Sequence, residues 1–263
     1  MSQKNYLCKN NHIRQTKHKI IINILNQQGW LGRTEMLIGA ENIEKLQSAH
    51  ILVAGLGGVG AYAAEALCRA GIGRLTIIDG DAVQPTNRNR QLLALCSVEG
   101  QPKTKVMAAR LRDINPEIQL ETINEFIRDE RLIEIVSRPY DYVVDAIDTL
   151  SPKVFLLYHG LKNHQRIVSS MGAGGKLDPL QIRVDDLSKT YNCRLAYILR
   201  KRLRRLGVTT GIKAVFSTEQ VDKELVEACD EQNKKSVVGT ISYLPAMFGL
   251  VCASVVIREL MQL

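Results

Sequence analysis

The chain has 263 residues, of which 45% are hydrophobic and 24% are charged, and its formal net charge is +8. A chain of this length and apolar content can bury a large core, so we expect a soluble globular protein of one large domain or at most two. Its apolar runs fall short of the roughly 20 residues that a membrane-spanning helix needs, and its N-terminus carries no secretory signal. The composition therefore argues against a membrane protein and predicts a cytoplasmic location.

Basic charge gathers at the N-terminus. No Asp or Glu precedes Glu35, whereas six basic residues do: Lys4, Lys9, Arg14, Lys17, Lys19 and Arg33. Residues 1–28 are also rich in Asn, which predicts either a disordered basic arm or an extension without a role. We expect residues 29–263 to form a single domain.

The cysteines are scattered and form no metal-binding pattern. They stand at positions 8, 68, 96, 193, 229 and 252, and no CxxC pair is present to supply metal ligands or a redox couple. Cys193 and Cys229 fall outside the predicted core strands, so each is a candidate nucleophile, weighed against the commoner reading as a reduced structural thiol.

From His50 onward, apolar strands alternate with amphipathic helices. A strand at 50–55, a helix at 58–71 and a strand at 74–79 form a βαβ unit. Further strands are predicted at 118–123, 141–148, 166–171, 181–186 and 212–217, and further helices at 103–114, 129–137, 150–162 and 193–207 and after Pro245. This order predicts an α/β fold with a doubly wound, mostly parallel sheet that binds ligands at the carboxyl ends of its strands.

The first strand leads into the glycine sequence GLGGVG at residues 55–60. In such a loop Gly55 permits a tight turn, Gly57 lets the backbone approach a phosphate, and Gly60 allows close packing of the following helix. Asp79, at the end of the next strand, is placed to bind a ribose hydroxyl. On its own this pattern is a weak signal, and its default interpretation is a dinucleotide-binding dehydrogenase.

The residues after Asp79 favour a nucleoside triphosphate. The sequence DGDAVQPTNRNRQ at residues 79–91 places Asn87 and Arg90 beyond the ribose-binding carboxylate, and Lys103 begins the next helix. Two cations directed at one nucleotide suit a triphosphate, whose charge must be neutralised during group transfer. Asp148, near the end of a later strand, is a candidate ligand of Mg²⁺ beside the same phosphates.

These motifs, in the order GxGGxG, DxDxVxxxNxxRQ, GxPK and DxxD, resemble the adenylating fold of ubiquitin-activating enzymes and of the bacterial relatives that activate sulfur-carrier proteins. The resemblance covers residues 30–263 and implies a Rossmann-like ATP-binding half that uses ATP and Mg²⁺. It implies a nucleotide site made of Gly55, Gly57, Gly58, Gly60, Asp79, Asp81, Asn87, Arg90, Lys103 and Asp148. Arg33, in GRTEMLIG, resembles an arginine that a partner subunit contributes in trans, which implies a homodimer.

The second half of the chain resembles one branch of that superfamily, the tRNA threonylcarbamoyladenosine dehydratases. The resemblance is carried by SSMGAGGKLDPLQIRVDDLSKT at 169–190, the basic run from Arg194 to Arg205, KAVFSTE at 213–219 and PAMFGLVCASVVI at 245–257. It implies ATP-dependent closure of the threonylcarbamoyl side chain of a tRNA adenosine into a ring. The sulfur-carrier activators usually carry paired CxxC zinc motifs, which this chain lacks.

The basic run predicts an RNA-binding helix from its own pattern. Leu195, Ile198, Leu199, Leu203 and Leu206 recur at helical spacing, and no acidic residue lies between Arg194 and Gly207. The cations are Arg194, Arg200, Lys201, Arg202, Arg204 and Arg205. A tRNA backbone offers the complementary charge, whereas the plainer interpretation is a solvated helix face.

The expected chemistry is adenylation of the substrate carboxylate, with Arg90, Lys103 and a Mg²⁺ ion on Asp148 neutralising the departing pyrophosphate. Ring closure then needs orientation of the substrate rather than a protein nucleophile. The sequence GAGGK at 172–176 is either a turn or a site for substrate or a monovalent cation. Alternatives are an activator of a ubiquitin-like or sulfur-carrier protein, with a sulfur-transfer protein as partner, an NAD-dependent oxidoreductase, and a non-catalytic tRNA-binding protein.

Overall fold

The structure is a computed structural model that describes residues 29–221, 226–231 and 234–263. The chain divides into two compact units, Met1–Lys45 and Leu46–Leu263. The described part of the first unit holds the short helix η1 (Gly29–Leu31), α2 (Gly32–Ile38) and most of α3 (Ala40–Ser48). The predicted basic arm, residues 1–28, lies outside the described residues.

The second unit is built on a seven-stranded sheet with the order β3-β2-β1-β4-β5-β7-β6. Its strands are β1 (His50–Ala54), β2 (Arg74–Ile78), β3 (Gln119–Ile123), β4 (Tyr142–Asp145), β5 (Ile167–Ser170), β6 (Ile182–Asp186) and β7 (Lys213–Ser217). All neighbours are parallel except β6, which pairs antiparallel with β7. The order reverses between β1 and β4, which confirms the predicted doubly wound α/β fold.

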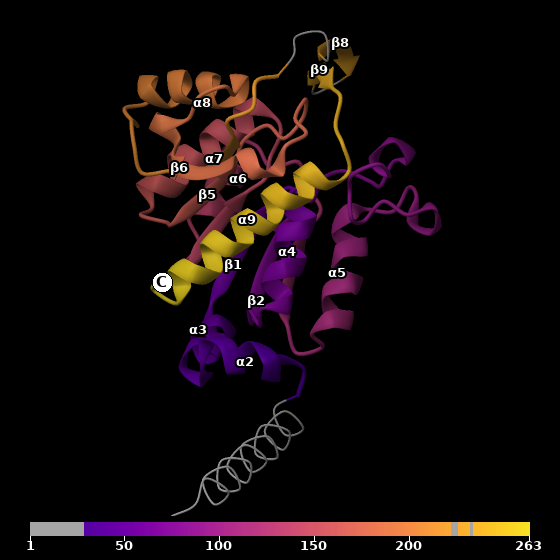
Figure 1. Cartoon of the computed structure of the whole chain (residues 1–263), viewed down its shortest axis with the longest axis vertical. Helices are drawn as coiled ribbons and strands as arrows, with labels where there is room; N and C mark the ends of the chain where they lie inside the picture. Colours follow the sequence, from indigo (N-terminus) through magenta and orange to yellow (C-terminus); the bar gives the residue numbers. More distant parts are fainter. Residues whose placement is uncertain (1–28, 222–225, 232–233) are drawn as a thin grey trace, which may run out of the picture. The chain divides into compact units, whose positions relative to one another are not determined.

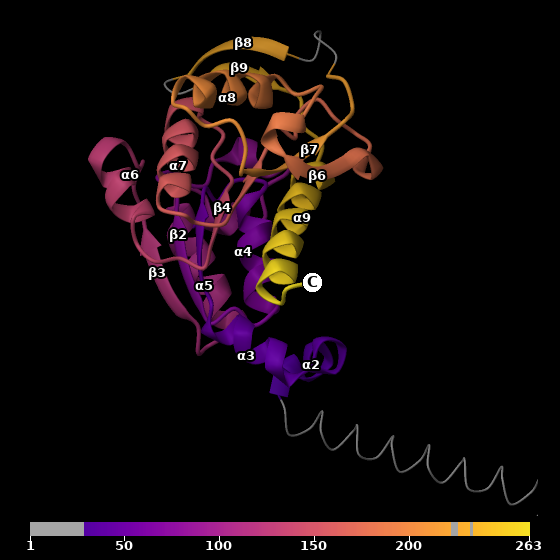
Figure 2. The ribbon, with the colours of Figure 1, turned by 90° about the vertical axis from the view of Figure 1, so that its left-hand side faces the viewer.

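Helices cover both faces of this sheet, as Figure 2 shows. One layer contains α4 (Gly60–Arg69), α5 (Lys103–Ile114) and α9 (Tyr243–Leu260), and the other contains α6 (Asp129–Val136), α7 (Leu150–Lys162) and α8 (Arg194–Arg205). Short helical turns lie at η2 (Pro85–Asn87), η3 (Cys96–Val98), η4 (Pro179–Gln181) and η5 (Leu187–Lys189). Buried leucines of α6, α7 and α8, such as Leu132, Leu156 and Leu199, join one apolar core with the sheet.

Three details differ from the expectation. β4 ends at Asp145 rather than Asp148, because the Asp145 carboxylate accepts a hydrogen bond from the Ile147 amide (3.1 Å) and turns the chain out of the sheet. α9 begins at Tyr243, so Pro245 lies in the first turn, where its missing N–H costs no helical bond. A two-stranded sheet, β8 (Val226–Glu231) and β9 (Lys234–Val238), was not predicted, since this polar stretch lacks alternating apolar residues.

α9 packs along α4, as Figure 1 shows, and also against β5. By length and composition it is the one described helix that is apolar enough to cross a membrane. Leu244, Phe248, Cys252 and Val256 are buried at four-residue intervals, so one face of α9 belongs to the core. A Cβ on Gly249 would lie 2.2 Å from the Val59 carbonyl oxygen, so glycine is what lets α9 cross the start of α4.

Candidate functional site

The glycine loop lies between the end of β1 and the start of α4. Gly55 has φ +91°, and a Cβ there would lie 2.7 Å from the Ala146 carbonyl oxygen. A Cβ on Gly60 would lie 1.8 Å from the carbonyl oxygen of Gly55, so these two positions accept only glycine. A Cβ on Gly57 would meet a single atom within 4 Å, Nε2 of Gln91 at 3.9 Å. The backbone at Gly57 is therefore open to a ligand next to the N-terminus of α4.

Asp79 follows β2, and its carboxylate is fixed by two backbone amides. One oxygen accepts from the Leu56 amide and the other from the Asp81 amide, both at 2.7 Å. Its side chain is 8% exposed, and this burial raises the pKa of the carboxyl, although Lys103 and the two amides oppose the shift. Asp79 thereby ties the turn after β2 to the glycine loop, at the edge where a ribose was expected.

Lys103 is more enclosed than expected of a residue that clamps phosphates. Its ammonium is 2.8 Å from a carboxylate oxygen of Asp81 and 3.9 Å from one of Asp79, and the side chain is 5% exposed. The Lys103 amide also donates to the Asp81 carbonyl (3.0 Å). Asp81 itself is half exposed. The cation is therefore held by two carboxylates at the edge of the glycine loop.

Arg90 and Asn87 lie in the turn that follows Asp81. The Arg90 stem packs beside Gly58, and its guanidinium donates to the Thr86 carbonyl (3.0 Å) and to the Asn89 side chain (2.8 Å). The side-chain oxygen of Asn87 accepts from the Gln84 amide (3.2 Å), which closes the turn η2. The turn thus places Arg90 beside the glycine loop and gives Asn87 a supporting role that the sequence did not indicate.

The sequence analysis did not predict a buried ion pair that lies close to the turn before Asp148. Lys153 and Asp145 are both fully buried, 2.7 Å apart, and Asp145 also accepts from the Ser169 hydroxyl at 2.6 Å. The Lys153 ammonium donates to the Ile147 carbonyl (3.0 Å), so the pair holds the turn that leads to the exposed Asp148. The spacing DxxDxxxxK is the only signal in the sequence that could have indicated this pair.

An exposed ring beside the Asp79 turn was also missed. Phe126, just beyond β3, is 57% exposed, and a Cβ on Gly80 would lie 2.7 Å from its ring. The ring therefore packs directly on the backbone between Asp79 and Asp81. No motif in the sequence links these positions, which are far apart along the chain.

The GAGGK loop follows β5 and is braced by residues near the end of β9. The Gly175 amide donates to the Gly239 carbonyl (2.7 Å), and Asn89 reaches the Thr240 carbonyl (3.0 Å). The buried Lys176 ammonium donates to the carbonyls of Ser217 (3.0 Å) and Glu219 (2.8 Å), and burial lowers the pKa of this lysine. The cation that these carbonyls bind is thus the Lys176 ammonium, a group of the chain itself.

Three of the described thiols, Cys68, Cys193 and Cys252, are buried, whereas Cys96 is exposed and accepts a hydrogen bond from the Arg88 guanidinium (2.9 Å). Cys193 is buried at the N-cap of α8, and Cys229 belongs to the part of the chain whose side chains are not described. Burial raises the pKa of Cys68 to about 11 and that of Cys252 to about 12, which disfavours the thiolate at neutral pH. Among the described residues, no three His, Cys, Asp or Glu side chains group as a metal centre.

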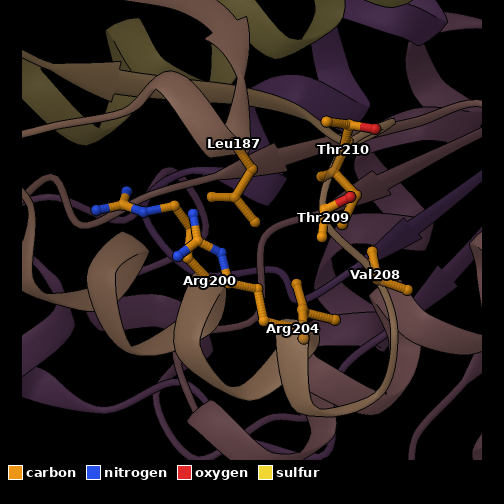
Figure 3. A pocket seen from close by; sticks show the side chains of 8 residues that line it. Leu187, Arg200, Arg204, Val208, Thr209 and Thr210 are labelled. Carbon is orange, nitrogen blue, oxygen red and sulfur yellow. The ribbon is translucent and has the colours of Figure 1, made fainter.

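The basic run forms α8, which buries Ala196, Leu199 and Leu203 and exposes its opposite face. Five of its six cations are exposed: Arg194, Lys201, Arg202, Arg204 and Arg205. Arg200 is half-buried and donates to the Thr190 hydroxyl. Figure 3 shows a small pocket at the end of α8, lined by Arg200 and Arg204 from the helix and by Thr209 and Thr210 from the loop that follows.

Arg33, the residue expected to act in trans, is an exposed residue of α2 in the first unit. The remaining site residues belong to the second unit, where the carboxyl ends of β1, β2 and β4 bring together the glycine loop, Asp79 and the turn before Asp148. This edge is the one that the strand order predicted for a ligand.

The chain is similar to known proteins in both sequence and fold. The ThiF family matches residues 31–263. The tRNA threonylcarbamoyladenosine dehydratase of Bacillus subtilis is 38% identical over 238 residues, which cover 88% of this chain and 94% of the relative. The Escherichia coli enzyme of the same name is 40% identical over 88% of this chain and 92% of its own. The crystal structure of that E. coli dehydratase in complex with ATP superposes with a TM-score of 0.81 at 39% identity, and covers 88% of this chain and 93% of that one.

Proposed function

The chain belongs to the ThiF family and, within it, to the tRNA threonylcarbamoyladenosine dehydratases, and we propose that it closes the threonylcarbamoyl group of a tRNA adenosine into a ring at the expense of ATP. The observation that carries the proposal is the glycine cradle at the carboxyl edge of the sheet, in a chain whose fold matches an ATP complex of a dehydratase over most of its length. It is an ATP-dependent enzyme of tRNA modification.

The cradle suits a triphosphate. A Cβ would be blocked at Gly55 and Gly60, whereas the backbone at Gly57 is open and lies next to the positive end of α4. Arg90 lies beside Gly58 with a guanidinium that holds only a carbonyl and an amide oxygen, so it is available to a phosphate without breaking an ion pair among the described residues. Lys103 can turn to the same phosphates, because the Asp81 carboxylate is half exposed and water can replace the lysine as its hydrogen-bond partner.

Mg²⁺ fits the donors that are present. This ion usually takes one or two protein carboxylates and completes its coordination with phosphates and water, and Asp148 is an exposed carboxylate in the turn that follows β4. When bound, Mg²⁺ would neutralise charge on the phosphates during transfer. The buried Asp145–Lys153 pair would hold the turn that carries Asp148 in place. We also propose that a monovalent cation binds near the GAGGK loop. Two backbone carbonyls there already accept hydrogen bonds from the Lys176 ammonium.

The reaction balances without a protein nucleophile. A carboxylate oxygen of the threonylcarbamoyl group attacks the α-phosphorus of ATP, and the P–O bond to pyrophosphate breaks. The carbamoyl oxygen then attacks the activated carbonyl carbon, its nitrogen loses a proton, and AMP departs with one carboxylate oxygen. The buried thiols described above take no part, and the site has only to orient the two ends of one side chain.

The RNA contacts are proposed to lie on α8. Five exposed cations on one helix, with no ion pair to them among the described residues, complement a phosphate backbone. By contrast, a protein that activates a sulfur carrier or a ubiquitin-like protein needs a surface for a small protein partner. The names of both relatives described above favour the RNA substrate.

We also infer a homodimer with a shared site, in which Arg33 of one chain completes the nucleotide site of the other. Mixing inactive Arg33→Ala and Asp148→Ala chains should restore part of the activity, because a heterodimer contains one intact site. If heterodimers form and the mixture stays as inactive as either variant alone, the shared site is wrong.

The enzyme assay that tests the function uses purified protein, ATP, Mg²⁺ and tRNA that carries threonylcarbamoyladenosine. Mass spectrometry of the nucleosides should show the loss of one water. A heavy-oxygen label in the substrate carboxylate should appear in AMP. Label in inorganic phosphate, with ADP as product, would keep the dehydratase and replace adenylation by an acyl phosphate. No change in nucleoside mass, in protein that binds ATP, would contradict the proposed function.

A further inference from the structure

The exposed face of α8 carries one aromatic ring among its cations. Tyr197 lies three residues after Arg194, four residues before Lys201 and seven residues before Arg204. Residues at these spacings share one face of a helix, so the ring lies between the cations and opposite the buried Leu199 and Leu203. Tyr197 thus stands in the middle of the surface proposed to bind RNA.

The ring is not part of the core. Tyr197 is 59% exposed, and within the described residues its hydroxyl has no hydrogen-bond partner and its ring has no aromatic neighbour. Tyr191, just before the helix, is exposed to a similar degree (54%) but differs in its partner, because its ring lies edge-on to the buried Phe216 with 5.6 Å between ring centroids. More than half of this ring is therefore open to a ligand that offers it an apolar face.

The neighbouring charges restrict the chemistry of that ligand. Arg194, Lys201 and Arg204 are exposed, no described acidic side chain forms an ion pair with them, and the helix itself has no acidic residue. The ligand must therefore bring negative charge at several points and a flat apolar face between them. An RNA duplex offers phosphates but buries the faces of its bases by stacking, whereas an unpaired nucleotide offers both.

We propose that Tyr197 is a stacking platform for an unpaired base of the RNA substrate, while the cations around it contact the flanking phosphates. The inference rests on the proposed function for the identity of the ligand as RNA. It adds that α8 reads a single-stranded loop rather than a stem. Arg200 is directed to Thr190 and takes no part in this stripe.

The test compares binding of two RNAs of equal length, a hairpin with 2-aminopurine in its loop and a blunt duplex. The wild-type chain should bind the hairpin more tightly and quench the 2-aminopurine, since stacking quenches this base. Tyr197→Ala should weaken hairpin binding by about 5- to 150-fold, the range for loss of one stacked base, and should leave duplex binding unchanged. The salt dependence of hairpin binding should not move, because no phosphate contact is lost.

Tyr197→Phe is the matched control, because it keeps the ring and removes only the hydroxyl; it should bind the hairpin as the wild type does. Tyr197→Leu keeps apolar area without a π face and should resemble Tyr197→Ala. Equal hairpin binding by wild type and Tyr197→Ala, an equal loss in Tyr197→Phe, or a preference for the duplex would each overturn the proposal, as would capture of an acidic peptide in place of RNA.

These outcomes separate the inference from the function. Hairpin binding needs neither ATP nor turnover, so a chain that stacks the loop base and forms no cyclic product would contradict the proposed function alone. If the Tyr197→Ala variant dehydrates tRNA as efficiently as the wild type at substrate concentrations below KM, that result would contradict the stacking platform alone.

Discussion

The nucleotide edge and the basic helix use charge in opposite ways. At the edge, the cations Lys103 and Lys153 are almost fully buried, each within 2.8 Å of a carboxylate. On α8, five cations stand in solvent with no ion pair to a described residue. Buried charges are fixed and scarcely screened by salt, whereas exposed charges are mobile and strongly screened.

The difference matches the size of the two ligands. A nucleotide that reacts must be held at atomic precision, which the Asp145–Lys153 pair and the glycine cradle provide before it arrives. A long polyanion can be held by many weak contacts that need no fixed geometry. Replacing one residue should therefore be severe at the edge and mild on the helix, and the predictions below test that contrast from the largest effect to the smallest.

Replacing Lys153 by Met should lower the free energy of unfolding by about 3–5 kcal/mol, because it leaves Asp145 buried without its partner. Lys162→Met is the control, since Lys162 is exposed on the same helix. Denaturant unfolding followed by circular dichroism measures both. The double variant Asp145→Asn with Lys153→Met should recover much of the loss; a loss in the double variant as large as in Lys153→Met would show that charge is not the cause.

Replacing Lys103 by Ala should lower the dehydration rate by at least ~10²–10³-fold, the scale for losing one fixed group that stabilises transferred charge. Asp148→Ala should behave likewise. Lys105→Ala changes an exposed lysine on the same helix, α5, and should leave the rate unchanged. Rates come from nucleoside mass spectrometry, with thermal unfolding to verify that each variant folds. Similar rates for Lys103→Ala and Lys105→Ala would remove Lys103 from the site.

Replacing Lys201, Arg204 and Arg205 together by Ala should weaken tRNA binding by about 10²-fold at low salt. The salt dependence of binding should also become flatter, because a variant that makes fewer phosphate contacts releases fewer counterions when it binds. ATP affinity should not change. Filter binding between low and physiological salt gives the slope, and Arg112→Ala on α5 serves as a distant exposed control. An unchanged slope in the triple variant would show that α8 is a solvated face.

The smallest effect is expected at Asp186, which ties the chain on both sides of α8 by accepting from the amides of Ser188 (2.8 Å) and Gly211 (2.7 Å). Burial raises the pKa of Asp186, but these hydrogen bonds outweigh burial and hold the pKa below its ordinary value. The stabilisation is therefore present above the ordinary pKa and is lost as the pH falls through the lowered one.

Asp186→Asn should accordingly cost about 1 kcal/mol of stability at neutral pH, with the gap to the wild type closing below about pH 4. Thermal unfolding of the two chains from pH 7 to pH 3 measures it. A gap that stays constant over this range would mean that the carboxylate charge does not contribute.

Much of the fold could be read from the chain, because each signal for it is local. The β–α alternation follows from apolar periodicity. The helix α7 has the predicted bounds 150–162, because Thr149 marks its start and the apolar spacing ends near Lys162. β8 and β9 were missed because a polar stretch has no such period. Gly55 and Gly60 carry their own constraint, since only glycine fits where backbone meets backbone.

The sequence by itself determined the order of the strands along the chain, the GLGGVG motif and the basic face of α8, since each is a pattern within a short stretch of chain. Only the tertiary structure decided that Asp145 and Lys153 share a buried site, that Phe126 rests on Gly80, and that Lys103 meets Asp81. Those contacts depend on strand register and helix packing, which join distant residues. The same long-range packing removes water from around the charges, and that desolvation gives the nucleotide edge its fixed geometry.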